Sequence, residues 1–90
     1  MMAQRSINRR EGESNSQRKR RNMMAIVHNV VEVGEVCKAH QIYHRLCVAY
    51  PNGHHSMPQS VNQLGQIMRA EKSMRKITVG NNQYEWRRIE

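Results

Sequence analysis

The chain has 90 residues, which limits it to one domain, and its 15 lysine and arginine residues outnumber its 7 acidic residues to give a net charge of +8. No apolar run approaches the ~20 residues that a membrane-spanning helix needs, and no apolar stretch follows the basic N-terminus as it would in a signal peptide. We therefore expect no membrane partner and a cytoplasmic, nucleoid-associated location, or a nuclear one in a eukaryote. The positive charge favours DNA or RNA as the partner.

The first 22 residues contain almost no apolar side chains and are rich in arginine. Such a segment cannot bury enough surface to offset the conformational entropy that it would lose on ordering. We therefore expect a flexible basic arm over residues 1–22 and a folded domain over 23–90. A domain of this size is marginally stable alone, so a homodimer would help it. The arm would contact phosphates or a minor groove through its densest cluster, which is Arg18, Lys19, Arg20 and Arg21.

Two helices are predicted in the first half of the domain. Asn22 is a suitable N-cap for the first helix, and Gly34 is its natural stop. Residues 35–37 would then form a brief strand or the start of the next helix. Apolar residues recur at helical spacing over 38–50, which predicts the second helix, and the Pro-Asn-Gly sequence at 51–53 ends it.

A third, amphipathic helix is predicted to begin at Ser60 and to run to about residue 71. Ser60 and Gln63 have the spacing of a capping box, in which each side chain satisfies a backbone amide of the other. The expected buried stripe consists of Val61, Leu64, Ile67 and Met68. The opposite, polar side carries Asn62, Gln63, Gln66 and Arg69.

An alternating basic ribbon follows over residues 74–89 and predicts a β-hairpin. Residues 80–82 read Gly-Asn-Asn and tolerate the positive φ angles that a tight turn requires. On the return strand, Tyr84, Trp86 and Arg88 share one face. We expect both aromatic side chains to pack against the helices as part of the core.

The order of these elements resembles the winged helix-turn-helix domain. The residues that carry the likeness are 41–46 (Gln-Ile-Tyr-His-Arg-Leu), 60–68 (Ser-Val-Asn-Gln-Leu-Gly-Gln-Ile-Met) and 84–86 (Tyr-Glu-Trp). The stretch from 60 to 86 is also similar to the small winged helices that end some viral and phage primase-helicases. The resemblance implies an α+β fold of three helices and a C-terminal hairpin wing. The sequence departs from the family at residues 51–59, because this loop exceeds the 3–4-residue turn of a compact helix-turn-helix.

The resemblance implies a non-enzymatic protein that binds double-stranded DNA, as a transcriptional regulator or an architectural factor. The third helix would enter the major groove, where asparagine and glutamine pair with adenine edges and arginine pairs with guanine. The basic wing would hold phosphates, which position a protein without reading sequence. Besides the arm cluster, the expected DNA-binding residues are Asn62, Gln63, Gln66, Arg69, Lys72, Arg75, Lys76, Asn81, Asn82, Arg87 and Arg88.

Two other functions remain open from the sequence. A basic arm joined to a small basic domain also suits RNA or a ribosome, and exposed Tyr84 and Trp86 would then stack on bases. Alternatively, the domain is a protein–protein adaptor, because a fold does not determine a function.

Metal binding and catalysis receive less support. Cys37, His40, His44 and Cys47 have a spacing of zinc-type ligands, but on one continuous helix they would extend over ~15 Å. Only neighbouring pairs such as His40 and His44 could share an ion, and they would need His54 or His55 to complete the site. The chain has no aspartate, its glutamates are scattered, and no glycine-rich phosphate loop occurs. We therefore predict no metal site, no cofactor and no enzymatic activity.

Overall fold

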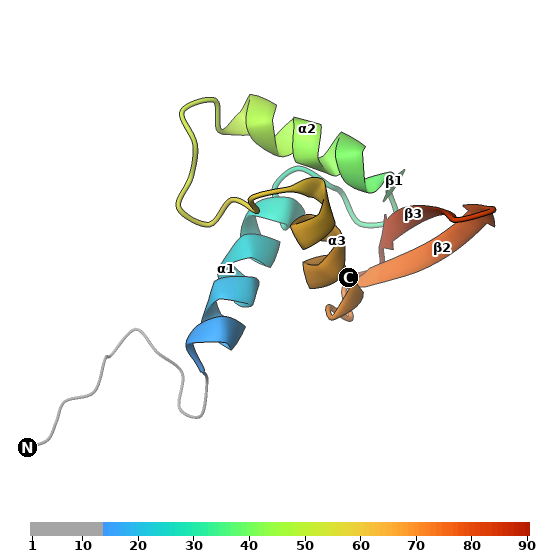
Figure 1. The fold of residues 1–90 in the computed structure, drawn as a ribbon, viewed down its shortest axis with the longest axis horizontal. Coiled ribbons are helices and arrows are strands. Elements are labelled where there is room, and N and C mark those ends of the chain that lie inside the picture. The colour runs from blue at the N-terminus through green and yellow to red at the C-terminus, as the bar shows by residue number, and fades with distance from the viewer. Residues whose placement is uncertain (1–13) are drawn as a thin grey trace, which may run out of the picture.

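The structure, a computed structural model, describes residues 14–90 and contains three helices and a three-stranded antiparallel sheet. This is the α+β arrangement of three helices and a C-terminal hairpin that the sequence predicts (Figure 1). In chain order the elements are α1 (Asn15–His28), β1 (Val36–Cys37), α2 (Ala39–Ala49), α3 (Val61–Arg69), β2 (Met74–Gly80) and β3 (Gln83–Arg88).

Helix α1 begins much earlier than predicted. Its N-cap is Ser14, whose Oγ accepts a hydrogen bond from Gln17 N at 3.1 Å, while Gln17 Oε1 accepts one from Ser14 N at 2.9 Å. This capping box, followed by arginine and lysine residues of high helix propensity, starts the helix although the segment is polar. The prediction of a flexible arm is therefore wrong for residues 15–22, which include the cluster 18–21. Residues 1–13 of that arm lie outside the described residues.

Helix α1 also ends earlier than predicted, at His28 rather than near Gly34. The β-branched pair Val30 and Val31 follows in a turn, and Val31 is fully buried there. Gly34 adopts a φ of +89° in the segment before β1, a left-handed conformation that favours glycine. Of the two alternatives expected for residues 35–37, a brief strand or the start of the next helix, the structure has the strand β1.

The sheet has the order β1-β3-β2, with both pairs antiparallel. Trp86 on β3 lies between Cys37 of β1 and Lys76 of β2. Asn82 supplies the expected positive φ, +57°, in the turn between β2 and β3. A register shift between Thr78 and Gly80 marks a bulge near this turn. The predicted hairpin is thus confirmed.

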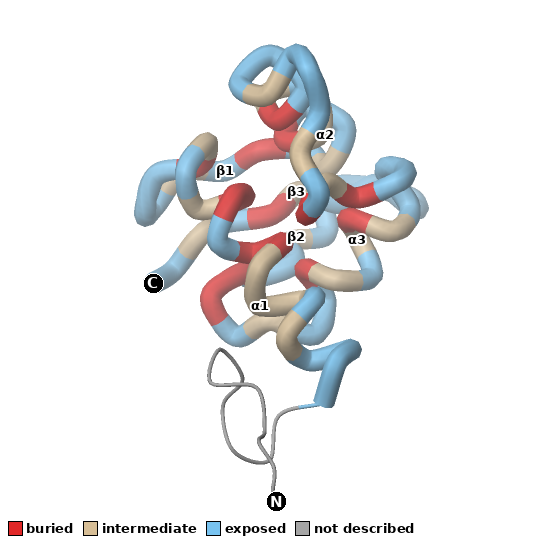
Figure 2. Tube along the Cα trace, turned by 90° about the vertical axis from the view of Figure 1, so that its left-hand side faces the viewer, coloured by how far each residue is buried: buried red, intermediate tan, exposed pale blue. Residues whose placement is uncertain are grey.

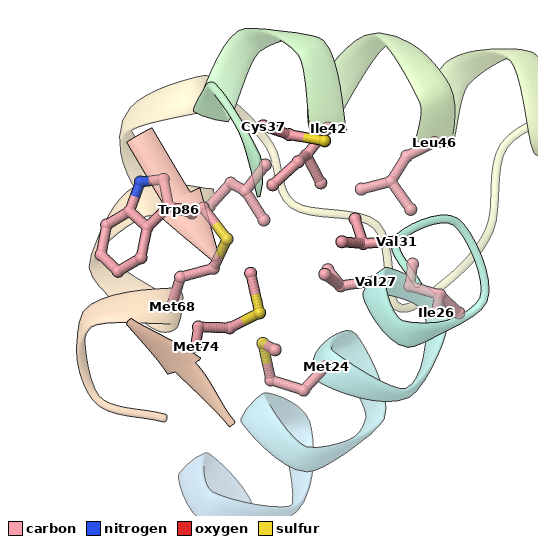
Figure 3. Packing of buried hydrophobic residues seen from close by; sticks show 11 residues of the cluster. Met24, Ile26, Val27, Val31, Cys37, Ile42, Leu46, Met68, Met74 and Trp86 are labelled. Carbon is pink, nitrogen blue, oxygen red and sulfur yellow. The ribbon is translucent and has the colours of Figure 1, made fainter. Parts of the chain in front are cut away.

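The core lies where the three helices meet the sheet (Figure 2). Figure 3 shows side chains from α1, α2, α3 and both hairpin strands converging on one cluster. Three expected core residues are outside it: Ile67 is partly buried and packs against it, whereas Val61 is 36% exposed and Tyr84 is 41% exposed. The cluster consists of Met24, Ile26, Val27, Val31, Cys37, Ile42, Leu46, Leu64, Met68, Met74 and Trp86.

Residues 14–90 contain no helix with the length and apolar character needed to cross a lipid bilayer.

Candidate nucleic-acid interface

Helix α3 is held by its cap and by two buried anchors. Ser60 Oγ accepts a hydrogen bond from Gln63 N at 3.1 Å, as predicted. The side chain of Gln63 does not complete a capping box with Ser60, because its Oε1 accepts a hydrogen bond from Gln59 N at 2.5 Å. Leu64 and Met68 are fully buried and fix the inward face of the helix. Gln63 is therefore half-buried and occupied in capping, which reduces its availability to a base.

The outward face of α3 carries the other three residues predicted to read DNA. Asn62, Gln66 and Arg69 are all exposed. The helix contains no acidic residue, so nothing on its own surface neutralises Arg69. The amide and guanidinium groups of this face are the donor and acceptor types that bind base edges.

The two faces of the hairpin separate the predicted phosphate-binding residues. Trp86 is buried against the helices, and Figure 3 shows it next to Met68. Lys76 is the cross-strand partner of Trp86 and therefore lies on this inner face, on the same side of the sheet as α3. Arg75 and Arg87 are partners of each other, one residue along, and therefore lie on the outer face. The structure does not bring these two arginines together with α3.

Lys76 contacts Tyr84 on the inner face of the hairpin. Its Nζ lies 3.8 Å from the centroid of the tyrosine ring, which is a cation–π contact. Tyr84 remains 41% exposed because this part of the hairpin extends beyond the helices. Asn81 and Asn82 follow at the exposed turn, and Lys72 is exposed in the loop before β2.

Arg88 points into the molecule rather than toward a ligand. Its Nη1 donates hydrogen bonds to His28 O at 3.1 Å and to Val31 O at 2.7 Å, and its Nε donates to Glu90 O at 2.9 Å. The guanidinium thus binds carbonyl groups at the end of α1 and in the turn that follows. Because these hydrogen bonds occupy its guanidinium, Arg88 is a structural residue and is not one of the exposed residues available to DNA.

The basic cluster of α1 is remote from the hairpin. Arg18, Arg20 and Arg21 are half-buried and Lys19 is exposed. Figure 1 shows the start of α1 and the hairpin at opposite ends of the molecule. The cluster therefore forms a second basic region instead of an extension of the hairpin.

One carboxylate is engaged in an ion pair away from α3. Glu35, ahead of β1, accepts a hydrogen bond from Arg45 Nη2 at 2.5 Å, and also accepts one from Glu32 N at 3.0 Å. The bond from Arg45, followed by the backbone bond, lowers the pKa of Glu35 from its ordinary 4.5 to about 2. Glu85 is the cross-strand partner of Ile77 and lies on the outer face of the hairpin. The inner face of the hairpin and α3 thus carry no carboxylate of their own, and Glu71 follows α3 by two residues.

The residues weighed as zinc ligands do not form a site. Cys37 is on β1 and buried, which raises the pKa of its thiol, whereas Cys47 is exposed on α2. The rings of His54 and His55 stack on each other with their centroids 4.5 Å apart. Within residues 14–90, no group of three or more histidine, cysteine or acidic residues is placed to hold a metal ion.

Comparison of the chain with protein-family models, with curated proteins and with solved structures finds no match.

Proposed function

We propose that this protein binds double-stranded DNA without enzymatic activity, as a transcriptional regulator or an architectural factor of the winged-helix type. The observation that carries the proposal is the pairing of the exposed polar face of α3 with Lys76 on the same side of the sheet. A helix that presents amides and an arginine fits a major groove, and a neighbouring basic strand fits the adjacent phosphates.

The proposed roles follow from side-chain chemistry. Asn62 and Gln66 would pair with adenine edges, and Arg69 would bind guanine or a phosphate. Lys76 and Lys72 would neutralise phosphates, and the turn at 81–82 would offer neutral hydrogen-bonding groups to the backbone. Arg75 and Arg87 are not assigned to this surface, because they lie on the outer face of the hairpin.

A fluorescence anisotropy titration of duplex DNA over a series of salt concentrations tests the proposal. We expect affinity to fall as salt rises, because bound lysine and arginine residues release counterions from the phosphates. Lys76→Ala should weaken binding and reduce the logarithmic salt slope by about 0.9, the value for one lost phosphate contact. Arg87→Ala removes the same charge from the outer face and should leave the slope unchanged. Absence of duplex binding at low salt, or equal effects of the two variants, would contradict the proposal.

Sequence reading is tested separately with Gln66→Ala and Arg69→Ala. Each should reduce the preference for a selected sequence over random duplex, by about 1–3 kcal/mol where a bidentate base contact is lost. If both variants keep full function and partner binding, the domain acts as a protein–protein adaptor.

One observation favours RNA as a second candidate ligand. Tyr84 was expected to pack onto the helices, but it is 41% exposed beside Lys76, where an unpaired base can stack on the ring. Competition between duplex DNA and structured RNA for the same protein discriminates the two ligands. Preference for RNA, together with a loss of affinity in Tyr84→Ala but not in Gln66→Ala, would replace DNA by RNA.

A further inference from the structure

Strand β2 forms an edge of the sheet, because β3 lies between β2 and β1. The backbone of Arg88 on β3 faces β1: its N–H donates to Glu35 O at 3.1 Å, and its carbonyl accepts from Gly34 N at 2.6 Å. Backbone groups along a strand point alternately to its two sides. The backbone groups of the alternate residues Arg87 and Glu85 therefore point toward β2.

The same alternation determines which groups of β2 are free. Arg75 and Ile77 pair with those two residues of β3 and direct their own backbone groups inward. The N–H and carbonyl groups of Lys76 and Thr78 consequently point away from the sheet. Among residues 14–90, the only strand that pairs with β2 is β3. An unpaired row of donors and acceptors is a template for another strand.

A lysine on an edge strand normally discourages such pairing by its charge. Here the ammonium of Lys76 is drawn over the Tyr84 ring on β3, at 3.8 Å from its centroid. The charge is therefore held on the inner face and toward the neighbouring strand rather than over the open edge. Thr78 and Ile77 beside it are β-branched residues that favour a strand.

We propose that β2 pairs with β2 of a second copy of this chain, antiparallel and about a two-fold axis at Ile77. This register sets Ile77 opposite its own copy and sets each Lys76 opposite a Thr78. The outward backbone groups of Lys76 and Thr78 then exchange four hydrogen bonds across the axis. A register shifted so that Lys76 of one chain lies opposite Lys76 of the other would instead place like charges face to face, which is destabilising.

The resulting dimer joins two three-stranded sheets into one six-stranded sheet. Only a short stretch of each strand is buried, so the interface belongs to the small, weak class. We therefore expect a dissociation constant above about 1 μM. Pairing uses backbone groups in the plane of the sheet, so it requires no nucleic acid. Its test is made with protein alone, and a failed DNA titration would leave it standing.

Disulfide cross-linking under mild oxidation tests the register. In a non-hydrogen-bonded antiparallel pair the Cα atoms lie about 4.5 Å apart, within the range that a disulfide spans. Ile77→Cys, made together with Cys47→Ser to remove the exposed native thiol, should therefore form a covalent dimer readily. Val36→Cys in the same background is the control, because Val36 is exposed on β1, which forms the opposite edge of the sheet from β2. Equal cross-linking of the two variants, or preferential cross-linking of Thr78→Cys, would overturn the proposal.

Sedimentation equilibrium tests the edge itself. Thr78→Pro removes an N–H that points away from β3, so the internal ladder is retained and only bonds between the two copies are lost. We expect the dissociation constant to rise at least about tenfold, as the loss of two hydrogen bonds per dimer implies. Thr78→Ala keeps the N–H and should preserve the dimer. A wild-type chain that is monomeric at about 1 mM would overturn the proposal whatever the variants do.

Discussion

Replacement of Arg88 by alanine should destabilise the fold more than replacement of any of the exposed arginines on α3 and the hairpin, which are Arg69, Arg75 and Arg87. One guanidinium nitrogen donates to two carbonyl oxygens near the end of α1, at 3.1 and 2.7 Å, and so ties β3 to that helix. Hydrogen bonds from a charged group contribute about 1.5–3 kcal/mol each, and water can partly replace them at a half-buried site. We therefore take a contribution of about 1–1.5 kcal/mol for each of the two bonds, at or slightly below the lower end of this range, and expect a loss of about 2–3 kcal/mol.

This loss is a large fraction of the expected free energy of unfolding. A domain the size of residues 14–90 has a free energy of unfolding of about 4–12 kcal/mol. The predicted change would lower the melting temperature by about 8–24 °C, at about 4–8 °C for each kcal/mol. Trp86 is the only tryptophan of the chain and is 5% exposed, so its fluorescence reports unfolding in urea directly.

Arg87→Ala provides the matched control for this measurement. Arg87 is the preceding residue on the same strand, but its side chain is exposed on the outer face. Its loss should change stability by less than about 0.5 kcal/mol. Arg88→Lys should be intermediate, because an ammonium keeps the charge but lacks the planar fork of donors. If Arg88→Ala and Arg87→Ala unfold at the same urea concentration, the carbonyl contacts of Arg88 contribute nothing, and the reasoning fails.

Three further predictions concern pH and the turn. Because its pKa is lowered to about 2, Glu35 stabilises the folded state above its ordinary pKa of 4.5, and this stabilisation is lost as pH falls from 4.5 toward 2. Glu35→Gln should therefore make the free energy of unfolding less dependent on pH over that window. An unchanged pH dependence would contradict the prediction. Burial, and then the nearby charge of Arg88, lower the pKa of His28, so the folded state resists protonation and loses stability as pH drops below about 6.5. His28→Gln should remove that loss in urea unfolding at pH 7.5 and 5.5, whereas an equal loss in both proteins would refute it. Asn82 has a φ of +57°, a conformation that a β-branched residue adopts only with strain. Asn82→Val should therefore lower the free energy of unfolding by about 1–2 kcal/mol, whereas Asn82→Gly should be nearly neutral. Equal melting temperatures of the two variants would contradict this.

The parts of the fold that the sequence predicts correctly depend on local signals. Ser60 caps α3, a glycine–asparagine turn closes the hairpin, and apolar spacing defines α2. The sequence prediction places the start of α1 too late, because it relies on apolar residues at helical spacing to identify a helix. Its N-terminal half is polar, and the signal that identifies it is the Ser14–Gln17 capping box.

The sequence misplaces those site residues whose environment depends on how far one element lies from another. The alternation of β3 correctly groups Tyr84, Trp86 and Arg88 on one face, but it cannot say how far the hairpin extends beyond the helices. Trp86 meets the core, Tyr84 lies past it, and Arg88 reaches backbone groups 57 and 60 residues away in the chain. Strand periodicity likewise places Arg75 and Lys76 on opposite faces, a distinction that grouping by charge overlooks.

The part of the hairpin that extends beyond the helices, here called its far half, has three separate surfaces. Inner-face side chains such as Lys76 lie on the side of α3, outer-face side chains such as Arg75 lie on the opposite side, and the backbone groups of Lys76 and Thr78 point along the sheet. Only Met74 and Trp86 anchor the two strands in the core, so the far half gains little from burial and should open locally at low cost. A partner that binds either the edge or the inner face would therefore order the same segment. Pairing of two copies through β2 should thus favour, rather than block, the proposed contact of Lys76 with phosphate.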